Sequence, residues 1–268
     1  KIIHVIVKKF VFDDQEFFEI PNIEINYNSL EIELKFICFP NKIWKNLEKS
    51  FNSNYLKIDN LYCSSYVKSA NYNSIFDNYK KKVFLDIGYG KSAITIFEDK
   101  RILYFNILPV GGKHITTDIA SLLKININEA ENFKKNLNQS ETVFINNFNK
   151  DGEIKTKDFM NQIIFARVDE IIKLNLTEEY FNTFLSNNDD SCVLVFIGNG
   201  SKILNKNSIY LEDKFDFFKE ISFFEENSKS ICESGFNFIQ MIKSQEVNFV
   251  PKKPRNKGFF EKFFHLFN

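Results

Sequence analysis

The sequence predicts a mixed α/β fold on the strength of three observations. Three apolar runs within residues 83–108 are joined first by a glycine-containing loop and then by a charged tight turn, which indicates consecutive antiparallel strands. Apolar residues recur at helical spacing through residues 129–137 and 159–184. A short apolar run at 191–197 predicts a buried strand that ends at Gly198-Asn199-Gly200, and α/β folds commonly bind ligands at such a strand end.

The first 58 residues predict two strands and one helix. Residues 2–7 and 30–39 read as strands, and Pro40-Asn41 ends the second run. A helix is expected next, because apolar residues recur at its spacing: Ile43, Trp44, Leu47 and Phe51. We expect Trp44 to belong to the core rather than to a ligand contact.

The loop after the first apolar run of residues 83–108 has the composition of a phosphate-binding turn. Gly88 and Gly90 remove the Cβ atoms that would block close approach, and successive backbone N–H groups in a tight turn can converge on an anion. Ser92 adds a hydroxyl and Lys91 could add a charge, while Asp86 could hold a Mg²⁺-bound water, because hard cations prefer oxygen ligands. A β-turn in which the glycines serve only geometry explains the short D-x-G-x-G spacing about equally well.

The helical stretch Glu129–Leu137 carries a second candidate contact. Asn128 is expected to cap this helix, with Glu131 as the acid of a capping box. Glu131 and Lys134 lie one turn apart and can pair on one helix face, either as ligand contacts or as a solvated ion pair. Residues 138–158 are polar and predict a loop or a short hairpin.

The C-terminal segment predicts a linker followed by an amphipathic helix. Residues 247–257 combine prolines with basic residues, which is a linker composition. Residues 258–268 place their apolar side chains on one arc of a helical wheel: Phe259, Phe260, Phe263, Phe264, Leu266 and Phe267. Such a helix favours the interface of an anionic membrane, and the alternative of a helix docked on the domain is disfavoured by the linker.

Composition narrows the class of protein. The chain has 268 residues, 44% hydrophobic and 26% charged, which fits one large globular domain or two modest ones. Its formal net charge is zero and no basic stripe carries interleaved aromatic residues, so nucleic acid is not an expected partner. The four cysteines lie far apart and the three histidines are isolated, so neither set predicts a metal site or a catalytic triad.

An ordered series of motifs covers nearly the whole chain. The D-I-G-x-G loop (Asp86–Gly90, called the D-I-G loop below) and its hairpin are followed by four further segments: Leu108–Ala120, Glu129–Lys134, Ile163–Ile171 and Val193–Ser201. In this order the motifs resemble the FtsA family of bacterial cell-division proteins, within the actin-like ATPases. The resemblance implies an α/β actin-like ATPase (ribonuclease H-like) lobe plus part of a small inserted α+β subdomain.

The resemblance also implies a division of the chain into five parts. These are part of an FtsA-specific inserted subdomain (1–58), a connecting helix of the first lobe (59–81), a second lobe with nucleotide-binding motifs (82–246), a flexible basic linker (247–257) and a membrane-targeting helix (258–268). Because the chain begins at Lys1 without Met, we expect a fragment whose first phosphate loop would lie upstream.

The same resemblance implies ATP and Mg²⁺ as cofactors, held on two sides of a cleft. The phosphate side would use Gly88, Gly90, Lys91 and Ser92, and the nucleoside side would use Glu131, Lys134, Gly198, Asn199 and Gly200. Further cofactor contacts would come from Asp86, Tyr89, Gly111, Gly112 and Ser201, with Asp86 also reaching the metal through water. Three of these residues depart from the family pattern in ways that bear on nucleotide affinity: Tyr89, Lys91 and Asn199.

The family's function gives the expected role. The protein would be a scaffold that tethers the FtsZ ring to the cytoplasmic face of the inner membrane at the division site. It would assemble into filaments, contact other division proteins, and bind ATP with weak or absent hydrolysis. An actin-like pilus-assembly scaffold and a sugar-kinase-type enzyme are the alternatives. The amphipathic tail argues against both, and no catalytic carboxylate constellation is recognisable for a kinase.

Overall fold

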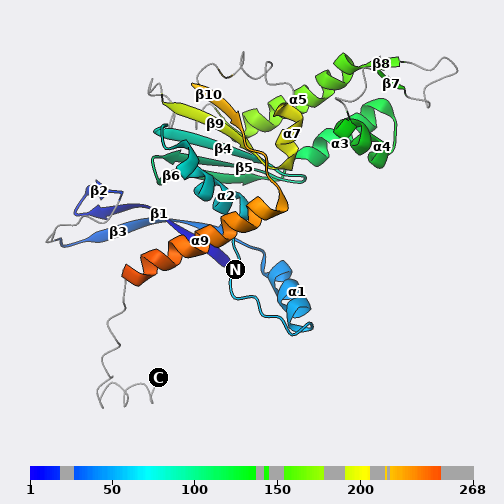
Figure 1. The fold of residues 1–268 in the computed structure, drawn as a ribbon. Helices are drawn as coiled ribbons and strands as arrows, with labels where there is room; N and C mark the ends of the chain where they lie inside the picture. The colour runs from blue at the N-terminus through cyan, green and yellow to red at the C-terminus, as the bar shows by residue number, and fades with distance from the viewer. Residues whose placement is uncertain are drawn as a thin grey trace.

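The computed structural model describes residues 1–18, 27–136, 142–144, 154–177, 191–205, 215 and 218–248. A central sheet is covered by helices on both faces, and a smaller sheet lies beside it (Figure 1). The predicted mixed α/β fold is therefore confirmed. The predicted linker begins two residues too early, because residues 247 and 248 still belong to a helix, and residues 249–268 with the predicted tail helix lie outside the described residues.

The central sheet has five strands in the order β10-β9-β4-β5-β6. The predicted hairpins are present, since β4 (Lys81–Ile87), β5 (Ser92–Glu98) and β6 (Arg101–Leu108) pair antiparallel in sequence. β9 (Cys192–Ile197) lies parallel to β4, and β10 (Glu220–Phe223) lies parallel to β9. Because β4 and β9 are parallel neighbours, the D-I-G and G-N-G motifs at their carboxyl ends share one edge of the sheet.

Alternation along β4 builds two cores, one on each face of the sheet. Val83, Leu85 and Ile87 pack in one cluster together with residues of α3 (Gly112–Leu123) and α5 (Lys157–Asn175). Phe84 belongs to the opposite cluster, with Tyr72 and Phe76. That second face is covered by α2 (Ser64–Asn73), η1 (Ser74–Phe76) and α9 (Ser228–Asn248), of which α9 packs on α2.

The smaller sheet has the order β2-β1-β3 and is antiparallel throughout. Its strands are β1 (Ile2–Phe12), β2 (Gln15–Phe17) and β3 (Leu30–Cys38). β1 is longer than its apolar run predicts, since after Lys8 and Lys9 it continues through the apolar residues 10–12, which pair with β3. Ile6 and Ile37 join this sheet to the central one by packing on Phe105 of β6.

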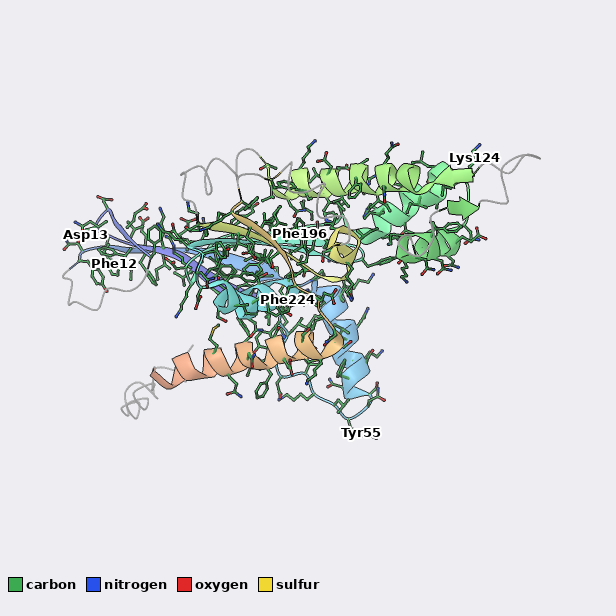
Figure 2. All side chains as sticks on the ribbon, turned by 45° about the horizontal axis from the view of Figure 1, so that its top comes forward. Phe12, Asp13, Tyr55, Lys124, Phe196 and Phe224 are labelled. Atoms are coloured by element: carbon green, nitrogen blue, oxygen red, sulfur yellow. The ribbon has the colours of Figure 1, made fainter. Side chains whose placement is uncertain are left out.

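The prediction that Trp44 belongs to the core is wrong. Every residue of α1 (Asn41–Asn52) is described and none is buried. The Trp44 ring is partly exposed and lies 3.3 Å from the Lys1 ammonium, as a cation–π contact. Beyond α1, Tyr55 is fully exposed and points away from both sheets (Figure 2).

The cap predicted for the helix after α3 also differs. α4 runs from Ile127 to Asn136, and the reciprocal hydrogen bonds join Asn126 and Glu129 instead of Asn128 and Glu131. Glu131 therefore takes no part in capping α4. The polar region that follows contains the short hairpin β7 (Thr142–Phe144) and β8 (Ile154–Thr156). After β9 come η2 (Asn199–Ser201) and α7 (Lys202–Asn205).

Candidate functional site

The D-I-G loop is fastened to the start of α3. Within the loop, Gly88 N–H donates to the Lys91 carbonyl at 2.8 Å. Gly112 N–H donates to the Gly88 carbonyl at 2.9 Å, and Lys113 N–H donates to the Tyr89 carbonyl at 2.6 Å. A Cβ at Gly111 would lie 2.6 Å from the Gly88 oxygen, so only glycine allows this approach.

His114 has a structural role at this junction, as its isolation in the sequence suggests. Its Nδ1 accepts a hydrogen bond from Gly111 N–H at 3.1 Å, and its own N–H donates to the Gly111 carbonyl at 2.9 Å. These bonds close the first turn of α3. Together with the bonds to Gly88 and Tyr89, they occupy the backbone N–H groups of residues 111–114, so this helix start is fastened to the loop.

The G-N-G motif is packed directly on the D-I-G loop. Gly198 has φ +86°, and a Cβ there would lie 2.3 Å from the Asp86 carboxylate. A Cβ at Gly200 would lie 2.6 Å from the Ile87 carbonyl oxygen. Ser201 is buried and donates its hydroxyl to the Gly198 carbonyl at 2.7 Å, so it shapes the turn. The two motifs, far apart in sequence, therefore form one continuous wall.

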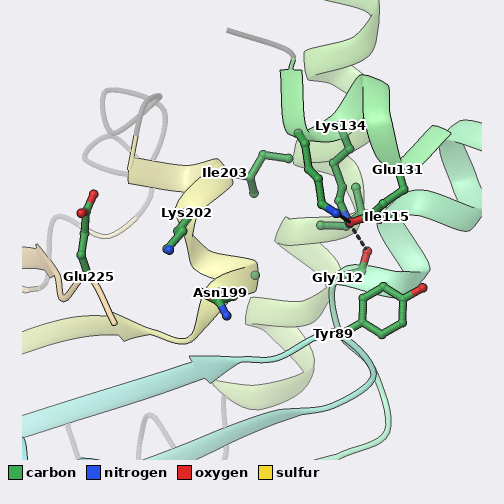
Figure 3. A pocket seen from close by; sticks show the side chains of 11 residues that line it. Tyr89, Gly112, Ile115, Glu131, Lys134, Asn199, Lys202, Ile203 and Glu225 are labelled. Atoms are coloured by element: carbon green, nitrogen blue, oxygen red, sulfur yellow. Dashed lines mark hydrogen bonds and ion pairs between the residues drawn. The ribbon is translucent and has the colours of Figure 1, made fainter. Parts of the chain in front are cut away.

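A cleft of about 640 Å³ opens beside this wall (Figure 3). Six residues expected from the sequence line it: Tyr89, Gly112, Glu131, Lys134, Asn199 and Gly200. Sequence reasoning missed five others: Ile115, Lys135, Lys202, Ile203 and Glu225. Lys202 and Ile203 come just after Ser201, the last predicted residue of the G-N-G segment, and Lys135 follows Lys134, so adjacency to predicted residues was the available signal.

Glu131 and Lys134 form an organised pair at the cleft rather than a solvated one. The Lys134 ammonium lies 2.7 Å from the Glu131 carboxylate and donates to the Gly112 carbonyl at 3.0 Å and to the Thr116 hydroxyl at 2.7 Å. Burial alone would raise the pKa of Glu131, but hydrogen bonds from Lys134 and Thr116 outweigh it and lower that pKa. Both side chains are mostly buried. Because Lys134 of α4 bonds to Gly112 and Thr116 of α3, the pair joins the two helices.

Eight of the predicted residues do not line the cleft: Asp86, Gly88, Gly90, Lys91, Ser92, Gly111, Gly198 and Ser201. Several support its wall instead. Ser92 is buried, and its hydroxyl accepts a hydrogen bond from the Asn175 amide of α5 at 2.9 Å. Lys91 is exposed on the loop. Whether these residues meet a nucleotide stays a prediction.

Asp86 lies behind the wall in a buried ionic cluster. Its carboxylate is 2.9 Å from the Lys68 ammonium of α2, and Lys68 also contacts Glu226 at 2.8 Å. Glu226 accepts a further hydrogen bond from Gly198 N–H at 2.9 Å. Burial would lower the pKa of Lys68, but Asp86 and Glu226 outweigh it and raise that pKa, so the ammonium stays charged.

The surroundings of Asp86 do not fit a magnesium site. Mg²⁺ requires oxygen ligands in octahedral geometry, and a neighbouring ammonium repels it. In the part of the chain that the structure describes, no three His, Cys, Asp or Glu side chains come together as a metal site.

Comparison with known proteins assigns the family. The sequence profile described as "Cell division protein FtsA" matches residues 83–223, more than half of the chain. The chain belongs to the FtsA family. FtsA of Borreliella burgdorferi is 27% identical over 188 residues, covering 66% of this chain and 45% of that protein. FtsA of Bacillus subtilis is 26% identical over 184 residues, covering 65% of this chain and 41% of that protein. This FtsA-family chain thus spans less than half the length of these relatives.

Solved structures show that the FtsA-family chain has an actin-like ATPase fold. The PilM–PilN type IV pilus biogenesis complex matches with a TM-score of 0.56 and 16% identity, covering 81% of this chain and 56% of that one. MreB 5 of Spiroplasma citri, bound to AMPPNP, matches with a TM-score of 0.56 and 14% identity, covering 78% and 67%. Among the helices within the described ranges, none is long and apolar enough to cross a membrane.

Proposed function

We propose that this FtsA-family chain is an ATP-binding cell-division scaffold that tethers the FtsZ ring to the cytoplasmic face of the inner membrane. The observation that carries the nucleotide part is the cleft between the D-I-G loop, the start of α3 and the G-N-G motif. Solved MreB5 structures of the same fold are described as bound to AMPPNP and ADP, which supports the same class of ligand here.

The lining of the cleft suits a nucleotide in chemical terms. Lys134, Lys135 and Lys202 supply positive charge to the lining of the cleft, which favours phosphates. Ile115 and Ile203 supply apolar surface that a base can cover. Glu131 offers carboxylate oxygens that can accept hydrogen bonds from ribose hydroxyls. From the family resemblance we propose weak or absent hydrolysis and an assembly role for ATP.

The nucleotide proposal is tested by calorimetric titration of ATP into the protein and into Lys134→Ala. Loss of this charged group, and of the Glu131 position that it holds, should weaken ATP binding by about tenfold or more. Lys173→Ala is the matched control, because Lys173 also pairs with a carboxylate on its own helix, Asp169 at 2.8 Å, but on α5 away from the cleft. If ATP affinity fell equally in both variants, or did not fall in Lys134→Ala, the cleft would not be the nucleotide site.

The tethering proposal rests on the FtsA family and on the amphipathic pattern of residues 258–268. The apolar arc would enter the headgroup region of an anionic membrane, while the globular part would meet FtsZ, other division proteins and further copies of itself in filaments. Vesicle co-sedimentation tests it directly. FtsZ should pellet with anionic vesicles only when this protein is present, and deletion of 258–268 should abolish that effect. FtsZ that stays in the supernatant with the intact protein would contradict tethering.

A further inference from the structure

Two carboxylates and one ammonium group are buried together beneath the two loops of the cleft. Lys68 from α2 lies between Asp86 at the end of β4 and Glu226 before α9, at 2.9 and 2.8 Å. Their side chains are only 7%, 8% and 2% exposed. Buried charges are stable only when they are paired, so this cluster is a fixed part of the fold and not a surface ion pair.

The Lys68 ammonium contacts Asp86, the residue at which the sequence predicts a Mg²⁺-bound water. Asp86 is the acid of the D-I-G motif, and its carboxylate is one of the two that face the ammonium. The cluster also reaches the second motif, because Glu226 accepts the Gly198 N–H and Gly198 sits against the Asp86 carboxylate. The other carboxylate oxygen of Glu226 has no partner among the described residues. Lys68 therefore gives Asp86 a directly paired positive charge, which it shares with Glu226.

We propose that the Lys68 ammonium is a built-in substitute for a divalent cation at Asp86, so that nucleotide binding in this cleft does not depend on Mg²⁺. The proposal rests on the nucleotide site proposed above. Without Lys68, two buried carboxylates would face each other beneath the loops. They would then attract a metal ion or repel the phosphates.

The first test compares ATP affinity in Mg²⁺ with ATP affinity in excess EDTA, by calorimetry on the unmodified protein. The two dissociation constants should agree within about threefold, because Asp86 is already paired with Lys68 and loses no contact with Mg²⁺ or its bound water. In Lys68→Met the affinity should become Mg²⁺-dependent by about tenfold or more, because Mg²⁺ then has to neutralise the two carboxylates. A tenfold or larger dependence in the unmodified protein would overturn the proposal.

Lys82→Met is the matched control. Lys82 is also buried and lies on β4, but its ammonium contacts the Asp99 carbonyl at 3.2 Å and Asp77 at 3.5 Å, at the end of the strand away from the loops. Removing this charge should leave nucleotide binding independent of Mg²⁺. A Mg²⁺ dependence that arose equally in Lys68→Met and Lys82→Met would mean that any lost buried lysine has this effect, and would overturn the proposal.

A second readout needs no nucleotide. Electron paramagnetic resonance of Mn²⁺ should show no retained ion in the unmodified protein and a retained ion in Lys68→Met. Stoichiometric Mn²⁺ binding by the unmodified protein, abolished in Asp86→Asn, would overturn the proposal even if Lys68→Met failed to fold. If ATP binds in neither Mg²⁺ nor EDTA, the nucleotide site is wrong, whereas the Mn²⁺ result still decides whether Lys68 excludes a metal from Asp86.

Discussion

Alanine at Gly111 should destabilise the junction between the D-I-G loop and α3. A Cβ atom at this position would lie 2.6 Å from the Gly88 carbonyl oxygen, and 2.8 and 2.9 Å from the backbone N and O of Lys91. All three neighbours are backbone atoms, so no side chain can rotate away. The loop itself must move by roughly 1 Å to restore ordinary contact.

The cost follows from what this movement disturbs. Overpacking against a fixed backbone costs about 1–3 kcal/mol. The shift also strains the hydrogen bonds from Gly112 N–H to Gly88 and from Lys113 N–H to Tyr89, and loss of one costs about 1 kcal/mol. We therefore expect the free energy of unfolding to fall by about 2–4 kcal/mol in Gly111→Ala.

Urea unfolding followed by circular dichroism measures this change, with Gly90→Ala as the control. No described atom lies within 4 Å of a Cβ built at Gly90, although this glycine belongs to the same loop. Its alanine variant should unfold within about 0.5 kcal/mol of the unmodified protein. Equal stability of Gly111→Ala and Gly90→Ala would refute the inferred packing of the loop on α3.

Three further predictions concern the loop, the tail and a buried histidine. Gly90→Val should keep the fold, because a Cβ there meets no described atom, but should weaken ATP binding, because the branched side chain enters the expected phosphate path. Unchanged ATP affinity in calorimetry would mean that the loop is only a turn and does not bind phosphate. Phe263→Glu should release the protein from anionic vesicles without lowering its melting temperature, since burying one Phe side chain contributes about 1.5–3 kcal/mol. Undiminished pelleting would contradict the membrane role, and a large drop in melting temperature would favour a docked helix. Burial lowers the pKa of His4 to about 4, so the unfolded chain, with a pKa near 6.5, binds a proton that the folded state excludes. The free energy of unfolding should therefore decrease as pH falls from 6.5 to 4, by about 2–3 kcal/mol at most, and His4→Gln should flatten that dependence in urea titrations.

Local patterns in the sequence were enough to predict the hairpins β4–β5–β6 and the strand β9. Alternating or continuous apolar runs bounded by turn residues encode a strand over a few residues, and the D-I-G and G-N-G motifs could be placed at strand ends. The same reasoning failed for Trp44, because periodicity says which face of a helix is apolar and says nothing about what covers it. It also misplaced the cap of α4, where two asparagines near the helix start offered similar signals.

Tertiary structure alone decided how the motifs meet. Sequence patterns assigned both glycine motifs to one ligand, but only the parallel pairing of β4 with β9 puts Gly198 against Asp86. The same holds for Ser92, whose hydroxyl was expected at a phosphate and is bonded to Asn175 of α5. Lys68 and Glu226 carry no motif, and their meeting at Asp86 follows from α2 and the segment before α9 covering the same face of the sheet. Local sequence encodes the period of an element, whereas the charges that share a buried space are chosen by long-range packing.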